Sequence, residues 1–136
     1  MRFYAAEARY SASGEASDRK ALLETLDRDI VLHQPASLPY GGSWRGREAF
    51  GEWLDAFTLA WKDIRPTDAV IMSCCDDMIV SPVTMHAVGR ESDAPISMPM
   101  CQVIRFSKHG PVEWRNFAWD TVAMVAALAC PIDRID

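Results

Sequence analysis

The chain has 136 residues, of which 49% are hydrophobic and 24% charged, and its formal net charge is −5. This length and composition predict one globular domain over residues 1–136, with a sizeable core. The negative charge, without any run of Lys or Arg, disfavours nucleic acid and anionic membrane surfaces as partners. No apolar run approaches the roughly 20 residues that span a bilayer, and the N-terminus lacks the apolar region of a signal peptide, so we expect a cytoplasmic protein.

The first third of the chain predicts two helices and a short strand. Apolar residues recur at helical spacing over residues 2–12, and Gly14 ends that pattern. A second helix is expected from Ser17, a capping residue, to about Asp27. Residues 29–34 then read as a strand that ends at a proline.

A Pro/Gly-rich loop separates this strand from a third helix, expected from Gly46 to Trp61. Its apolar stripe has the spacing i, i+3, i+4, i+7 and i+11 and consists of Phe50, Trp53, Leu54, Phe57 and Trp61. We expect most of this stripe to be plain core packing.

The second half of the chain has the alternating pattern of strands separated by turn signals. The expected strands are residues 70–74, 78–89, 96–106 and 112–119, and an alanine-rich helix over 120–129 closes the chain. Helices followed by hairpin strands predict an α+β domain, with helices on one face of a curved antiparallel sheet.

The strand over residues 96–106 has one apolar face, interrupted only by Gln102. The opposite face, with Pro99, Cys101 and Val103, is partly apolar and suits a homodimer contact. Gln34 interrupts the apolar face of the first strand in the same way. An unpartnered amide in an apolar setting costs about 1–3 kcal/mol, so each glutamine should meet a protein group or a ligand.

The four cysteines have neither CxxC spacing nor a nearby His pair, and no His/Asp/Glu set has metal spacing, so we expect no metal and no other cofactor. Cys74 and Cys75 should point to opposite faces of their strand, which disfavours a bond between them.

The order of elements, with the segments DIVLHQP, GREAFGEWLDAF, MCQVIRF and VEWRNFAWD, resembles the nuclear transport factor 2-like superfamily and its SnoaL-like branch. The resemblance covers nearly the whole chain. It implies a cone-shaped, cystatin-like fold, in which a curved antiparallel sheet wraps around the N-terminal helices and encloses an apolar pocket, usually in a dimer. The superfamily includes ketosteroid isomerases, polyketide cyclases, epoxide hydrolases and non-catalytic proteins, so the fold alone does not give the function.

Comparison with ketosteroid isomerases implies roles for individual residues. Their tyrosine donor falls at Tyr10, their general-base acid at Gln34, their oxyanion-hole acid at Gln102 and their pocket tryptophan at Trp119. Both acids are glutamines here, and an amide has no usable basicity. His33 is the nearest alternative base, although strand alternation points it away from Gln34.

These considerations give two sets of candidate residues. The catalytic candidates are Tyr10, His33 and Gln102; the ligand-binding candidates are Gln34, Tyr40, Trp44, Trp53, Phe57, Met100, Arg115, Phe117 and Trp119, with Arg115 either facing a ligand or paired with Glu113. Two functions remain open: a cofactor-independent isomerase, cyclase or hydrolase acting on a small hydrophobic molecule, and a non-catalytic ligand-binding or structural dimer module.

Overall fold

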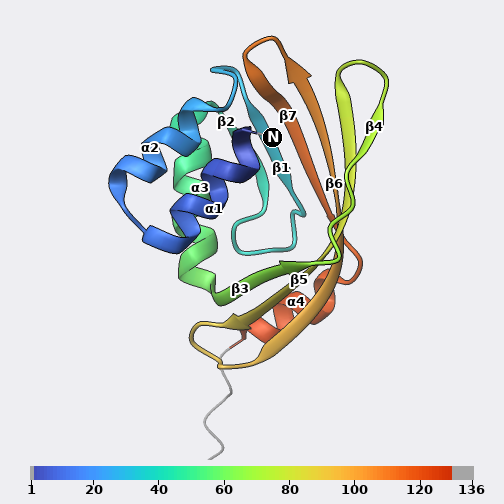
Figure 1. The fold of residues 1–136 in the computed structure, drawn as a ribbon. Helices are drawn as coiled ribbons and strands as arrows, with labels where there is room; N and C mark the ends of the chain where they lie inside the picture. Colours follow the sequence, from blue (N-terminus) through green and yellow to red (C-terminus); the bar gives the residue numbers. More distant parts are fainter. Residues whose placement is uncertain (1, 130–136) are drawn as a thin grey trace, which may run out of the picture.

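The computed structural model describes residues 2–129, and Figure 1 shows their arrangement. The elements are α1 (Arg2–Ser13), α2 (Ala16–Glu24), β1 (Val31–Gln34), β2 (Gly42–Arg45), α3 (Arg47–Ala60), β3 (Trp61–Thr67), β4 (Met72–Cys74), β5 (Met78–Gly89), β6 (Pro95–Ser107), β7 (Gly110–Ala118) and α4 (Thr121–Leu128). No helix in this range is long and apolar enough to cross a membrane.

The helices begin and end close to the predicted positions. Gly14, with φ of 65°, ends α1, and its N–H donates to the Tyr10 carbonyl. Ser17 does not cap α2, because that helix already begins at Ala16. Asp120 caps α4, and its carboxylate accepts a hydrogen bond from the Ala123 N–H at 3.0 Å.

The seven-stranded sheet has the order β2-β1-β7-β6-β5-β3, and β4 pairs with β5. The predicted antiparallel meander is confirmed for β4 to β7. The sheet also contains a parallel pair, in which Val31 of β1 lies beside Glu113 of β7. The first and last strands of the sequence are therefore neighbours.

Two strands were not predicted from the sequence. The strand β2 lies in the segment that was expected to be a loop. It was not predicted because it is short and its glycine weakens any strand pattern. The strand β3 contains Asp63 at φ of 52° and a register shift between Lys62 and Arg65, so its side chains do not alternate regularly.

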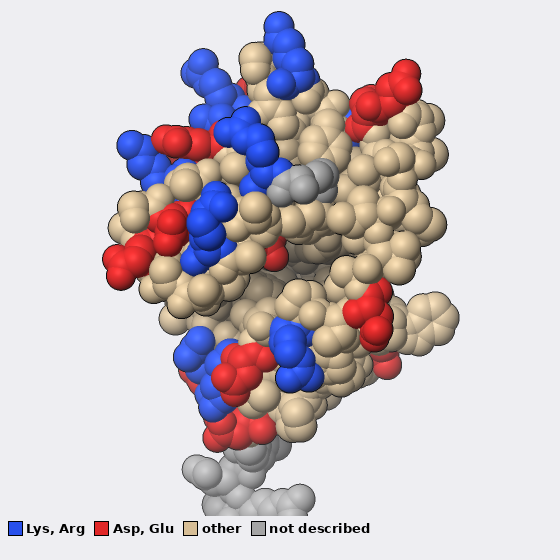
Figure 2. Space-filling model, in the orientation of Figure 1, with Lys and Arg blue, Asp and Glu red and all other residues tan. Residues whose placement is uncertain are grey.

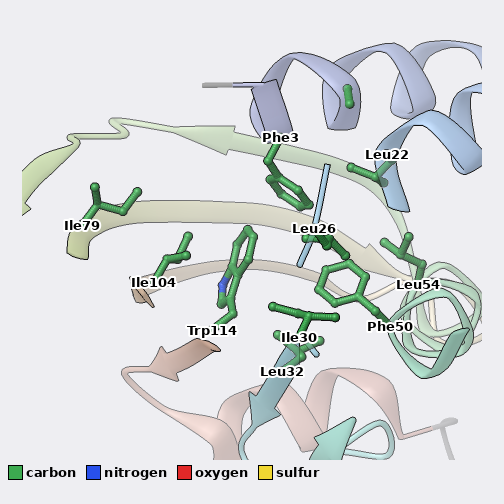
Figure 3. Packing of buried hydrophobic residues seen from close by; sticks show 11 residues of the cluster. Phe3, Leu22, Leu26, Ile30, Leu32, Phe50, Leu54, Ile79, Ile104 and Trp114 are labelled. Carbon is green, nitrogen blue, oxygen red and sulfur yellow. The ribbon is translucent and has the colours of Figure 1, made fainter. Parts of the chain in front are cut away.

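The sheet is curved and open, and α1, α2 and α3 cover its concave face (Figure 1). Figure 3 shows the rings of Phe3, Phe50 and Trp114 gathered between the helices and the sheet. Phe3 and Trp114 pack edge to face, with ring centroids 4.6 Å apart. A second cluster, around Trp61, Met98 and the α4 residue Met124, fills the other end of the concave side.

Candidate functional site

A row of polar side chains crosses the concave face of the sheet. Strand pairing sets Ser81 of β5 beside Gln102 of β6, and Gln102 beside Asn116 of β7. The parallel register of β1 and β7 pairs His33 with Arg115, so the next residue, Gln34, continues the row beside Asn116. We call Ser81, Gln102, Asn116 and Gln34 the polar row.

Apolar rows lie on both sides of the polar row. On one side, Ile79, Ile104, Trp114 and Leu32 are successive neighbours across four strands, and all belong to the first core cluster. On the other side, Val83, Met100 and Ala118 pair in the same way, and the last two pack against the second cluster. The polar row therefore marks the boundary between the two apolar clusters.

Tyr4 of α1 reaches down to the polar row. Its hydroxyl donates to Gln102 Oε1 at 3.0 Å, and the Ser81 hydroxyl forms a further hydrogen bond with Tyr4. Burial raises the pKa of Tyr4 above its ordinary value, which outweighs the lowering effect of Ser81. The phenol is thus held as a neutral group in a hydrogen-bonded chain from β5 through α1 to β6.

Glu7 lies one helical turn after Tyr4, and its negative charge also acts on that phenol. Burial raises the pKa of Glu7 from 4.5 to about 7. Its carboxyl group has no hydrogen-bond or ion-pair partner among the residues that the structure describes. A carboxyl group with this pKa can both accept and release a proton near neutral pH.

Two buried N–H donors close to this region have no partner among residues 2–129, namely Gln34 Nε2 and Trp53 Nε1. The residue Gln34 is only 7% exposed, and the Trp53 ring packs against both apolar clusters. Figure 2 shows that the surface is hollowed near the centre of this view, next to the part formed by the helices, with an acidic side chain at its edge. Buried donors without a partner are suited to bind an acceptor oxygen.

Several candidates from the sequence lie on the concave side. Phe57 packs between Trp53 and Tyr40, with centroid distances of 5.3 and 5.5 Å. Tyr40 is buried: its hydroxyl accepts a hydrogen bond from Trp61 Nε1, and burial raises its pKa to about 12. Trp44 donates to the Tyr40 carbonyl and touches both clusters.

Two catalytic candidates do not meet Gln102. The tyrosine that reaches Gln102 is Tyr4, not Tyr10, because the six-residue separation turns Tyr10 roughly 120° away around the helix axis. His33 points to the convex face, where its Nδ1 lies 2.9 Å from the Ser43 hydroxyl. Strand alternation, which keeps Gln34 inside, places His33 outside.

Three more candidates lie on the convex face and do not line the interior. Arg115 pairs with Glu113 at 2.9 Å, while Phe117 and Trp119 are 53% and 85% exposed. These three residues share one face of the chain. Trp114 of β7 points inward, so the odd-numbered residues point outward. A shallow hollow of about 370 Å³ at the end of β1, beside β7, is lined by residues of both faces: His33, Gln34, Pro35, Arg115, Asn116, Phe117, Ala118 and Thr121.

A cleft of about 660 Å³ lies between the start of α1, the end of α2 and the β6–β7 hairpin, and its rim carries four Lys or Arg residues. One of them, Arg47, donates to the Leu26 carbonyl at the end of α2. Hydrogen bonds from Ser107 and the Asp29 N–H lower the pKa of Asp27, which lies near this cleft. These contacts tie the helices to the hairpin, so we assign this region a structural role.

Four residues of the site were missed from the sequence: Tyr4, Glu7, Ser81 and Asn116. A signal was present for Glu7, because it follows Phe3 by four residues and Tyr4 by three, on the buried side of α1. Within residues 2–129, no group of three or more His, Cys, Asp or Glu side chains is arranged to hold a metal ion.

Comparisons with known proteins agree with this architecture. The chain is similar to a nuclear transport factor 2-like protein from Burkholderia xenovorans LB400, with a TM-score of 0.80 and 19% identity over 94% of this chain and 91% of that one. It is also similar to a protein with a ketosteroid isomerase-like fold from Catenulispora acidiphila DSM 44928 in complex with trimethylamine (TM-score 0.71, 14% identity, coverage 96% and 97%). A third similar structure is TerC co-crystallised with polyporic acid (TM-score 0.75, 14% identity, coverage 94% and 98%).

At these identities the solved structures establish the fold alone. A search of curated proteins found no significant match. The model of the SnoaL-like domain matches residues 2–114, which is most of the sequence. The matched range includes α1 and all of the polar row except Asn116. The chain therefore belongs to the SnoaL-like domain family.

Proposed function

We propose that this protein binds a small, largely apolar molecule with an acceptor oxygen, such as a carbonyl compound, on the concave side of the sheet. The observation that carries the proposal is the pair of buried, unpartnered donors, Gln34 Nε2 and Trp53 Nε1. Leaving such a donor unsatisfied costs about 1–3 kcal/mol. A ligand oxygen that accepts from them recovers this free energy on binding.

The surroundings of the polar row favour a ligand with a flat apolar body. Trp53 and Phe57 stack with an interplanar angle of 28° on the helix side, and Met100 and Trp114 flank the row on the sheet side. Such walls bind apolar surface, and the few polar groups between them orient the ligand. The ligands named for two similar structures, trimethylamine and polyporic acid, are also small organic molecules.

Glu7 favours a catalytic version of this function, because it provides the proton acceptor that Gln34 cannot. With a pKa of about 7, its carboxylate can remove a proton next to a ligand carbonyl. Negative charge that develops on the carbonyl oxygen would be stabilised by the N–H groups of Gln34 and Gln102. The reaction classes that fit are cofactor-independent isomerisation and cyclisation; a binding module without turnover is the alternative.

The binding proposal can be tested by calorimetry, which compares the wild-type protein with a Gln34→Leu variant. The probes are a steroid enone and a hydroxyquinone. Removing an unsatisfied buried amide should leave the thermal stability unchanged or raise it, while the affinity for a bound probe falls about tenfold. Arg115→Ala is the matched control, because Arg115 lines the shallow hollow at the end of β1 but does not belong to the polar row. Loss of binding in the control, with full binding by Gln34→Leu, would place the ligand outside the polar row and contradict this proposal.

The catalytic version is tested with the Glu7→Gln variant. NMR measures the rate at which the proton next to the probe carbonyl exchanges for deuterium. The variant should bind the probe with nearly wild-type affinity but lose exchange by a factor of about 100 or more. Full binding without exchange in the wild-type protein would instead identify a binding module. Equal exchange in both proteins would show that Glu7 is not the base.

A homodimer through the convex face is the oligomeric state that we propose. Phe117, Trp119 and Val122 are 53%, 85% and 78% exposed, and they follow one another along β7 and into α4. Large apolar side chains grouped on a surface are typical of protein contacts. Light scattering after chromatography should show a dimer for the wild-type protein and a monomer for Trp119→Glu.

A further inference from the structure

A pair of thiols is exposed at the tip of the hairpin between β4 and β5. Cys74 and Cys75 are both exposed, and their Sγ atoms lie 3.9 Å apart. The expectation that they point to opposite faces is wrong, because Cys75 leaves the strand with φ of 62°. This left-handed conformation turns its side chain back to the side of Cys74.

The separation of the two sulfur atoms suits a shared metal ion. With a metal–sulfur bond of about 2.3 Å, two ligands of a tetrahedral ion lie about 3.8 Å apart and two ligands of a trigonal ion about 4.0 Å apart. The observed 3.9 Å falls between these values. Both thiols can therefore coordinate one ion with little movement of the hairpin.

The surroundings of the pair favour a cation and permit its entry. Asp76 and Asp77 follow directly in the turn and are exposed, so they add negative charge beside the thiols. Figure 1 shows the β4 hairpin at the upper right of the view, away from the helices. Nothing in the described part of the chain covers either sulfur atom, and other ligands can complete the coordination from solvent.

We propose that Cys74 and Cys75 form a two-thiolate site for a soft divalent cation such as Zn²⁺ or Cd²⁺. Soft thiolate ligands select such ions over Mg²⁺ and Ca²⁺, which prefer oxygen. The hydrogen bond with Cys74 raises the pKa of the Cys75 thiol. Binding then forms two metal–sulfur bonds and releases two protons, and no electron is transferred.

The site lies outside the polar row, and its occupation is independent of the function proposed above. Cys101 of β6 offers an internal comparison, because it is a single, partly buried thiol with no second cysteine beside it among residues 2–129. Cys74→Ser, Cys75→Ser and Cys101→Ser each remove one thiol and so have the same number of thiols. Only the first two remove the pair, and Cys101→Ser is therefore their control.

The test is a titration of the full chain with Cd²⁺ in the presence of a thiol-free reductant. Binding is monitored by the ultraviolet absorption of cadmium–thiolate bonds. We expect one ion per chain for the wild-type protein and for Cys101→Ser, and affinities at least about tenfold lower for Cys74→Ser and Cys75→Ser. Circular dichroism checks that each variant is folded. No cadmium–thiolate absorption in the wild-type protein, or unchanged affinity in Cys74→Ser, would overturn the proposal.

Discussion

Glu7→Gln should make the protein more stable at high pH and leave its stability unchanged at low pH. The pKa of Glu7 rises from 4.5 to about 7 on folding, and one pKa unit corresponds to about 1.4 kcal/mol. Below pH 4.5 the carboxyl group is protonated in both states and has no effect. As the pH rises towards 7, the unfolded chain releases this proton and the folded chain keeps it, so the free energy of unfolding falls by about 3 kcal/mol.

Chemical denaturation at a series of pH values between 4 and 8 measures this effect as the difference between wild type and variant. The difference should be close to zero at pH 4, grow up to about pH 7 and then stay constant, with the variant the more stable protein. Glu52→Gln, which changes an exposed glutamate of α3, is the control and should not show this growth. A constant difference across the series would refute the conclusion that folding raises the pKa of Glu7.

Substitutions at three further positions test the fold around the site, each by the free energy of unfolding. Tyr40→Phe should cost about 1–3 kcal/mol, because it leaves the Trp61 Nε1 donor buried without a partner. Asp120→Ala should lower the free energy of unfolding by about 1 kcal/mol through loss of the α4 cap, whereas Asp120→Asn should keep most of the stabilisation that the cap provides. Gly110→Ala should destabilise the protein more than either, because a Cβ there would collide with the Thr25 carbonyl oxygen and φ is 120°; a variant as stable as wild type would contradict the close approach of the hairpin to the end of α2.

The helices and long strands could be predicted because their local signals agree with the tertiary structure. The stripe from Phe50 to Phe57 and the alternation of Met98, Met100 and Gln102 both survive in the fold. The resemblance to the SnoaL-like branch supplied the rest of the architecture. The strand β3 could not be found in this way, because its bulge interrupts the period of two on which strand prediction depends.

The site was harder to predict than the fold. The sequence indicated that Gln34 and Gln102 needed explanation, and the structure places both in one polar row. It could not show that Tyr4 rather than Tyr10 meets that row, since this depends on how α1 lies over the sheet. It also could not separate the inner from the outer face of β7, so Phe117 was assigned to the wrong side of the sheet.

The parallel pairing of β1 with β7 also affects how the chain can fold during synthesis. Val31 finds its partner, Glu113, only after nearly the whole domain has been made. Until then, β1 has only the short β2 beside it, and the apolar sides of α1 and α3 have no completed sheet to cover them. Contacts so distant in sequence slow folding and prolong exposure of apolar surface. We therefore expect chains that end before β7 to aggregate rather than to fold into a smaller domain.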